Sequence, residues 1–276
     1  MKKISGVLCL NKFDSDGDTL PFRADNLNDW SGLTIRPTPS SAHPWVRVRL
    51  DACDAPELHY ESLTQSTVFG RAAMEMTYQH LGGGFIDWSL VGNRPTNSEE
   101  IPVILEVVGV DQFKRVIGWL YPPGVSTTPE NSANYALLNW GLAYPAIYTT
   151  TPATHAPAAR DAWAAAIANA RGFAPIDTTA SFSFSHLAID QSEAMILPKI
   201  WRRVALFASQ NPDTTGWKAW MKTKRDLAMP VTGTVLDIRK NMTVTGDEAT
   251  VNAALITATW VPARSFTSSQ IFAWLH

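Results

Sequence analysis

Residues 45–57 read Trp45-Val46-Arg47-Val48-Arg49-Leu50-Asp51-Ala52-Cys53-Asp54-Ala55-Pro56-Glu57, an alternating run that passes directly into an acidic turn. Alternation of apolar and polar residues with a period of two is typical of a strand with one buried face. Similar β-type runs occur at residues 4–10, 101–110 and 116–121, and turn-rich segments separate them. Together these runs predict a small antiparallel barrel.

Helical spacing occurs at residues 68–81, 134–143 and 157–171. The third segment has a proline near its start, an alanine-rich interior, an expected apolar face of Trp163, Ile167 and Ala170, and Gly172 as a stop signal. About five strands with a few helices predict a mainly β fold, an OB-type barrel with helices packed on it. The stretch at 34–44, rich in Pro, Ser and Thr, is expected to be a long loop.

The chain of 276 residues is long enough for two ordinary domains. Residues 177–192 are rich in Ser, Thr and Phe without a clear period, which favours a connection there. Helical patterns at 196–208 and 216–229 then precede a β-rich tail at 231–274. We therefore expect a domain at residues 1–176 and an accessory α+β domain at 177–276.

The sequence predicts a soluble, cytoplasmic protein without a membrane segment, because no apolar run approaches the 18 to 20 residues that span a bilayer. The start, Met1-Lys2-Lys3 and an apolar run, imitates a signal peptide, but the run is short and lacks a cleavage site, so it is interpreted as the first strand. Cys9 and Cys53 are too few for a disulfide framework and are expected to be buried thiols in a reducing compartment.

The net charge of −2 hides an uneven distribution, −5 over residues 1–177 and +3 over residues 178–276. Proteins that bind nucleic acid normally draw on excess Lys and Arg, so the acidic part could need a cation to meet phosphate while the basic part supplies attraction. The basic part carries cations interleaved with tryptophans: Lys199, Arg202, Arg203, Lys218, Lys222, Lys224 and Arg225, with Trp201, Trp217 and Trp220. These residues form either a nucleic-acid contact surface or a core with a solvated charged face.

Three groups of carboxylates stand near predicted turns. They are Asp14, Asp16 and Asp18; Asp51, Asp54 and Glu57; and Asp111. Hard oxygen ligands of this kind suit Ca²⁺ or Mg²⁺, whereas the scarcity of Cys and the scattered His argue against zinc. Each group by itself is also common in structural turns.

Arginines lie close to these carboxylates in the sequence. Arg47 and Arg49 lie on one face of the strand that precedes the acidic turn, and Arg115 begins a strand just after Asp111. Surface ion pairing would account for each arginine singly. Phosphoryl transfer, however, requires this mixture of cations, carboxylates and a hard metal ion.

The order and spacing of five segments resemble the staphylococcal-type thermonuclease family across residues 1 to about 175. The segments are Asp16-Gly17-Asp18-Thr19, Val48-Arg49-Leu50-Asp51-Ala52-Cys53-Asp54-Ala55-Pro56-Glu57, Phe69-Gly70-Arg71-Ala72-Ala73, Asp111-Gln112-Phe113-Lys114-Arg115 and Asn139-Trp140-Gly141-Leu142-Ala143. An arginine eight residues before the glutamate, with a distant Asp-x-x-x-Arg, is a specific combination. The resemblance implies a Ca²⁺-dependent nuclease that cleaves DNA and RNA and leaves 3′-phosphate ends.

The resemblance also implies the metal site. Asp18 and Asp54 would bind Ca²⁺, or Mg²⁺ or another hard divalent cation, with help from the carbonyl of Ala55. The family usually has Thr at the position of Ala55, a change that a backbone ligand survives. Asp16 would be a supporting charge near the metal.

The same resemblance implies the catalytic residues. Glu57 would hold the attacking water and act as its base, and Arg49 and Arg115 would bind the phosphate and stabilise the transition state. Asp111 would position the loop that carries Arg115. Arg47 competes with Arg49, and the eight-residue interval to Glu57 selects Arg49.

Some features depart from the family pattern. Phe113 stands where the family often has Tyr, and a long insertion that includes Trp30 and Arg36 separates Thr19 from Arg49. Tyr148 belongs to a segment that aligns poorly, and it is predicted either to stack on a substrate base or to pack structurally.

Three functions follow from this reading. The first is a metal-dependent endonuclease whose accessory domain targets it, regulates it or binds a protein partner. The second is an inactive scaffold whose barrel binds nucleic acid or protein. The third is a phosphodiesterase for a small nucleotide, which the acidic first domain and the long insertion favour.

Overall fold

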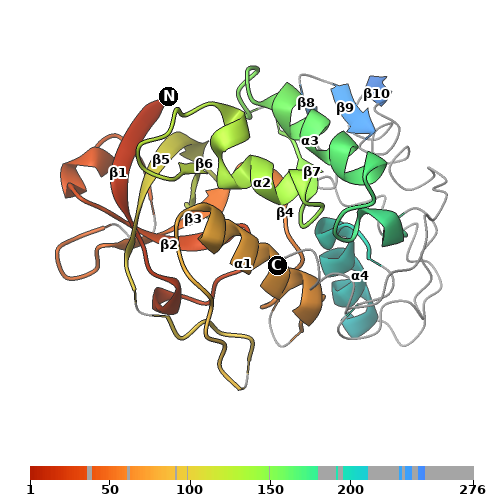
Figure 1. Ribbon diagram of the computed structural model, residues 1–276, viewed down its shortest axis with the longest axis horizontal. Coiled ribbons are helices and arrows are strands. Elements are labelled where there is room, and N and C mark those ends of the chain that lie inside the picture. Colours follow the sequence, from red (N-terminus) through yellow and green to blue (C-terminus); the bar gives the residue numbers. More distant parts are fainter. Residues whose placement is uncertain are drawn as a thin grey trace.

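The computed structural model shows a barrel with helices packed around it (Figure 1). The residues it describes are 1–35, 39–60, 63–90, 92–97, 99–148, 150–179, 191 and 195–210, with the backbone of 230–231, 234–237 and 242–245. The predicted helix at 216–229 and most of the predicted tail at 231–274 lie outside them. So do Arg36, Trp217, Lys218, Trp220, Lys222, Lys224 and Arg225.

Five strands close the barrel. In chain order they are β1 (Lys2–Leu8), β2 (Thr19–Ala24), β3 (Trp45–Leu50), β5 (Ile101–Val110) and β6 (Val116–Tyr121). Their order around the barrel is β1-β2-β3-β6-β5. Neighbours are antiparallel except β3 and β6, which are parallel. The OB-like barrel with helices is therefore confirmed, whereas a wholly antiparallel barrel was wrong at this one pair.

Buried and outward-facing residues alternate along β3, as the sequence predicts. Val46, Val48 and Leu50 are buried in the barrel, while Arg47 and Arg49 lie on the other face. β2 was not predicted, because the residues of this strand are nearly all buried and show no alternation. The first strand was predicted at residues 4–10, but in the structure it ends at Leu8 and a short 3-10 helix follows.

Serine side chains begin two of the helices on the barrel. Ser66 accepts a hydrogen bond from Phe69 N at the start of α1 (Thr67–His80), and Ser132 accepts one from Tyr135 N at the start of α2 (Ala133–Asn139). The prediction for α1 is close to the observed bounds. α2 ends earlier than predicted, since Gly141 follows in a left-handed conformation with φ of 65°.

The apolar face predicted for α3 (Ala156–Ala168) was partly wrong. Trp163 is buried as expected, but Ile167 is 42% exposed. The buried face consists of Ala159, Ala162, Trp163 and Ala166, with spacings of three and four residues. Ala170 lies beyond the end of the helix, with a positive φ of 51°. Trp163 packs against the rings of Tyr144 and Phe173.

A tight turn after β3 positions the acidic segment. Ala52 has φ of 60°, a left-handed conformation that turns the chain from β3 into the short strand β4 (Ala52–Asp54). β4 pairs with β7 (Tyr144–Ala146). Asp54 is therefore held by a second, two-stranded sheet at the edge of the barrel.

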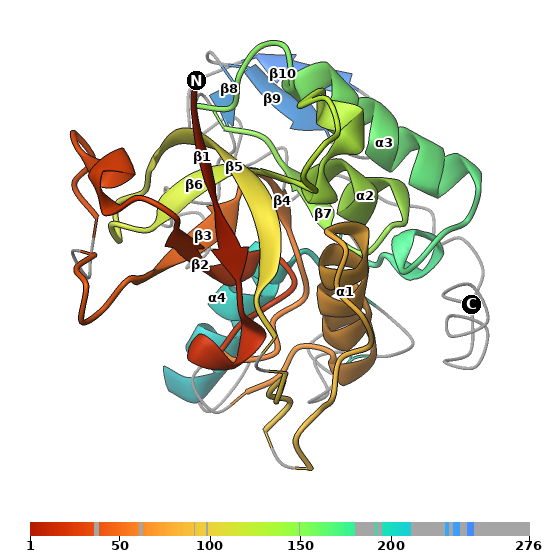
Figure 2. The same ribbon diagram turned by 60° about the vertical axis from the view of Figure 1, so that its left-hand side comes forward.

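The helix α4 (Pro198–Gln210) packs against the barrel side that carries this turn (Figure 2). Leu197, Ile200 and Trp201 belong to the same buried core as the barrel. Gln65, fully buried in the loop before α1, donates to Ile196 O at 2.7 Å. The helix predicted at 196–208 is thus confirmed, and Trp201 is a core residue. The division at residues 176 and 177 stays a prediction.

The remaining elements are short. They are the 3-10 helices η1 (Leu10–Lys12), η2 (Leu27–Trp30), η3 (Pro129–Asn131) and η4 (Ala174–Ile176), and the strands β8 (Pro230–Val231), β9 (Thr234–Asp237) and β10 (Met242–Thr245), which form one sheet. In the part of the chain that the structure describes, no helix has the length and apolar character needed to cross a membrane.

Candidate active site

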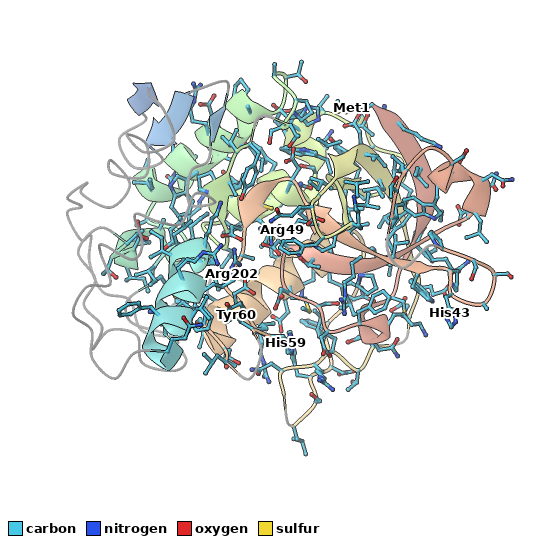
Figure 3. The ribbon with its side chains drawn as sticks, turned by 180° about the vertical axis from the view of Figure 1, so that it is seen from behind. Met1, His43, Arg49, His59, Tyr60 and Arg202 are labelled. Atoms are coloured by element: carbon cyan, nitrogen blue, oxygen red, sulfur yellow. The ribbon has the colours of Figure 1, made fainter. Side chains whose placement is uncertain are left out.

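A pocket of about 890 Å³ lies between the acidic turn after β3, the β5–β6 turn and α4. Figure 3 shows Arg49 of β3 and Arg202 of α4 near each other, and both guanidinium groups lie close to Asp54 Oδ1. The lining side chains that can carry charge are Asp16, Arg49, Asp51, Glu57, His59, Asp111, Arg115, Lys199, Arg202 and Arg203. Charged residues that are far apart in the sequence therefore meet in one cavity.

Arg49 joins the two carboxylates that the sequence analysis assigns to a metal. Its Nη1 donates to Asp18 Oδ1 at 2.9 Å, and its Nη2 donates to Asp54 Oδ1 at 2.6 Å. Ala55 N donates to the other oxygen of Asp18 at 2.6 Å. Both carboxylates are almost fully buried. One guanidinium thus holds the turn of Asp18 against the turn of Asp54 and Ala55.

Burial and charge act differently on these two carboxylates. Burial raises the pKa of Asp18, and the nearby Arg49 opposes the rise without cancelling it. Burial would also raise the pKa of Asp54, but the charges of Arg202 and Arg49 outweigh it and hold the pKa below its ordinary value. Asp54 is therefore the more firmly ionised member of the pair.

The structure separates Arg49 from its neighbour Arg47. Both lie on the same face of β3, but Arg47 is exposed and its guanidinium lies over the ring of Phe13 at 4.9 Å from the centroid. The side chain of Arg49 is 15% exposed and lines the pocket. Arg49 is therefore the arginine of this pair that contacts the carboxylates of Asp18 and Asp54.

Glu57 lies in the pocket in contact with a residue from α4. Arg202 Nη1 donates to Glu57 Oε1, and Arg202 Nη2 lies 3.5 Å from Asp54 Oδ1. Burial raises the pKa of Glu57 to about 8, and the negative charges of Asp16, Asp54 and Asp18 add to the rise while Arg202 opposes it. The pocket thus contains a buried carboxyl group whose proton affinity is close to that of a neutral-pH base.

Asp16 supports the loop that follows Glu57. Its Oδ1 accepts hydrogen bonds from Leu58 N at 2.9 Å and His59 N at 3.2 Å. The ring of His59 lies 3.6 Å from the same oxygen. Burial lowers the pKa of His59, but the nearby carboxylate of Asp16 and the hydrogen bond to Gly92 O more than offset this, so the pKa is raised. Asp16 consequently anchors the backbone beside Glu57.

Asp111 and Arg115 face each other across the β5–β6 turn. Asp111 accepts from Arg115 N at 2.8 Å and from Arg115 Nε at 2.7 Å. Lys114 closes the turn with φ of 67°, and the guanidinium of Arg115 lies 5.6 Å from the exposed ring of Phe113. The side chain of Arg115 is 31% exposed at the pocket rim. Asp111 therefore holds both the backbone and the side chain of Arg115.

Three cations from α4, Lys199, Arg202 and Arg203, were expected either on a nucleic-acid contact surface or on a solvated charged face. Lys199 N donates to Asp54 Oδ2 at 3.2 Å, and Lys199 Nζ lies 5.3 Å from the ring centre of Tyr148. Burial and nearby guanidinium groups lower the pKa of Lys199 to about 8, although Asp54 opposes this. The spacing of Lys199, Arg202 and Arg203 indicates one helical face, but the sequence does not indicate which surface that face meets.

Two carboxylates of the predicted acidic groups have other partners. Asp51 accepts from Trp119 Nε1 at 3.0 Å and from Thr151 Oγ1 at 2.9 Å, so its side chain ties the barrel to the segment before α3. Asp14 is half exposed and pairs with Arg94 on the surface. Asp18 and Asp54 share the guanidinium of Arg49, and Asp54 and Glu57 share that of Arg202.

Asp18 and Asp54 supply carboxylate oxygens, the ligands that hard cations prefer, and both carboxylates face the guanidinium of Arg49. Their oxygens already accept from Arg49, from Ala55 N and from Lys199 N. Within the described ranges, no three His, Cys, Asp or Glu side chains are grouped so that they could hold a metal ion. A metal at these carboxylates would therefore replace guanidinium contacts.

A scan against protein-family models and a search of curated proteins found no match to this chain. The thermonuclease resemblance consequently stays a prediction that depends on the residues themselves. The geometry of those residues is the basis for any functional proposal.

Proposed function

We propose that the chain is a divalent-cation-dependent phosphodiesterase of the thermonuclease type that hydrolyses DNA or RNA. One observation carries the proposal: Arg49 and Glu57 from residues 48–57 line one pocket with Arg115 from the β5–β6 turn, and Arg49 contacts Asp18 and Asp54. A carboxylate base and two arginines in one cavity are suited to a phosphodiester that is attacked by water.

Arg49 and Arg115 bind the phosphate in this proposal. Arginine presents a planar fork that matches two phosphate oxygens. Because Asp111 contacts the side chain of Arg115 through Nε, the two terminal nitrogens of that arginine can turn toward a ligand. Arg49 adds positive charge at the floor of the pocket, where negative charge develops on the phosphate during the reaction.

Glu57 acts as the base. It takes a proton from water as the water oxygen bonds to phosphorus. The bond from phosphorus to the leaving oxygen breaks, and that oxygen gains a proton from solvent to become a hydroxyl group. A pKa close to the working pH suits a general base, and the reaction begins from the ionised form of Glu57, which becomes more abundant as the pH rises toward about 8. A divalent cation at Asp18, Asp54 and the Ala55 carbonyl would supply charge neutralisation and polarise the phosphate when bound.

The test is cleavage of single-stranded DNA and of RNA by the purified chain with added Ca²⁺. Chelation and the substitution Glu57→Gln should each abolish cleavage, while the matched control Glu130→Gln, at an exposed residue outside the pocket, should retain it. Cleavage that survives both treatments would overturn the proposal. Binding without any cleavage would favour the scaffold function instead.

A second candidate is a phosphodiesterase for a small nucleotide. The observation that favours it is that α4 forms one wall of the pocket, whose volume of about 890 Å³ is within the range of small-ligand sites. Competition between a dinucleotide and single-stranded DNA distinguishes the two substrates. A dinucleotide hydrolysed far faster than DNA would favour the small-nucleotide function.

A further inference from the structure

The helix α4 places two cations at the wall of the candidate active site. Ile200 and Trp201 are buried in the common core, and Trp201 meets Tyr60 edge to face at 5.8 Å between ring centres. Lys199 N is bonded to Asp54. These contacts fix the first two turns of α4, so Lys199 and Arg202 are held facing the pocket.

Lys199 lacks a carboxylate partner for its ammonium group among the described residues, since every ion pair recorded there involves other cations. Its Nζ lies over the ring of Tyr148, and the residue is half-buried in the pocket wall. A half-buried ammonium supported by an aromatic face is suited to an incoming anion.

Arg202 already bonds to anions in this pocket. Its two terminal nitrogens face Glu57 and Asp54, and its side chain is 24% exposed. Arg49, on the barrel side, contacts the same oxygen of Asp54. The cations of α4 and of the barrel are therefore neighbours, close enough for one polyanionic ligand to meet both.

We propose that Lys199 and Arg202 form a second phosphate-binding subsite, contiguous with Arg49 and Arg115, that takes the phosphate next to the scissile phosphodiester. This inference rests on the proposed function and specifies its substrate: a nucleotide chain with a phosphate beyond the bond that is cleaved. Arg202 exchanges part of its contact with Glu57 for that phosphate, which releases a carboxylate oxygen toward the attacking water.

The experiment compares thymidine dinucleotides that carry no terminal phosphate, a 5′-phosphate or a 3′-phosphate. One terminal phosphate should lower KM by about tenfold, the smaller effect expected for a hydrogen bond to a charged group. In Lys199→Gln and in Arg202→Gln this preference should fall to nearly one, and Lys199→Arg should restore it. Arg160→Gln, a control at a 41% exposed, surface-paired arginine on α3, should keep the full preference.

Equilibrium binding of the same dinucleotides with chelator present separates this inference from the proposed function. Tighter binding of one phosphorylated dinucleotide that depends on Lys199 supports the subsite even if nothing is cleaved. Cleavage without any preference for a terminal phosphate would overturn the subsite while leaving the nuclease in place. Faster turnover of all three dinucleotides in Arg202→Gln would also overturn it, because Arg202 would then obstruct the site.

Discussion

Replacing Arg115 by alanine should separate catalysis from folding. The lost ion pair with Asp111 is partly exposed, at 31% for Arg115 and 15% for Asp111. Such a pair is worth at most about 1 kcal/mol, or a melting shift of roughly 2–4 °C for a chain of this size. Asp111 keeps its hydrogen bond to the backbone N–H of residue 115, so the turn should persist. Loss of one charge-stabilising group should lower turnover by about 10² to 10³.

Arg49→Ala provides the contrast. Asp18 and Asp54 are 2% and 3% exposed, so removing Arg49 leaves two buried carboxylates without this guanidinium. Breaking a buried pair costs about 3–5 kcal/mol, several times more than the change at Arg115. Cleavage rates and thermal melting should be measured for both variants. Arg23→Ala is the control, since the side chain of Arg23 is 33% exposed and pairs with Glu100. Near wild-type turnover in Arg115→Ala, or a melting shift as large as that of Arg49→Ala, would refute this reasoning.

Three further predictions concern Asp51 and Cys53. Asp51→Ala should destabilise the fold by about 1–3 kcal/mol for each of the two buried donors it leaves, Trp119 Nε1 and Thr151 Oγ1, and urea unfolding measures this. Burial raises the pKa of Asp51, so its protonated form stabilises the fold at low pH and this contribution declines as the pH rises through the folded pKa. The wild type should therefore lose stability relative to Asp51→Asn over that rise. A difference in unfolding free energy between the two that is the same at pH 3 and pH 7 would contradict this prediction. Burial also raises the pKa of the Cys53 thiol, so a thiol reagent at neutral pH should react with it only after unfolding, and rapid labelling of the native chain at this residue would disprove the placement.

Local patterns predicted the parts of the site that are close in sequence. The interval from Arg49 to Glu57 contains the end of one strand, one left-handed turn and one short strand, and the eight-residue interval of the resembled family selected Arg49 over Arg47. The Asp111 to Arg115 turn was also readable, because both residues belong to one hairpin. In each case the candidate residues are close in sequence to the turn that positions them.

Contacts between distant segments were not predictable in the same way. The parallel pairing of β3 with β6 depends on the closure of the barrel, which no local pattern records. Asp51 resembled its acidic neighbours in sequence, yet buried donors from Trp119 and Thr151 give it a structural task. Lys199 and Arg202 carried a helical spacing, but the face that this helix meets is set by the burial of Ile200 and Trp201.

The helix α4 brings cations from the basic part of the chain to a pocket in the acidic part. Residues 1–177 are acidic overall and include the carboxylates Asp18, Asp54 and Glu57, which by themselves would repel phosphate. Lys199, Arg202 and Arg203, from the basic remainder, line the same pocket as Glu57. Cutting the chain at residue 176 would remove these cations and also expose the core surface that Leu197, Ile200 and Trp201 cover. The predicted boundary therefore divides both a core and a candidate site, so the first 176 residues alone should bind phosphate more weakly and unfold more easily than the full chain.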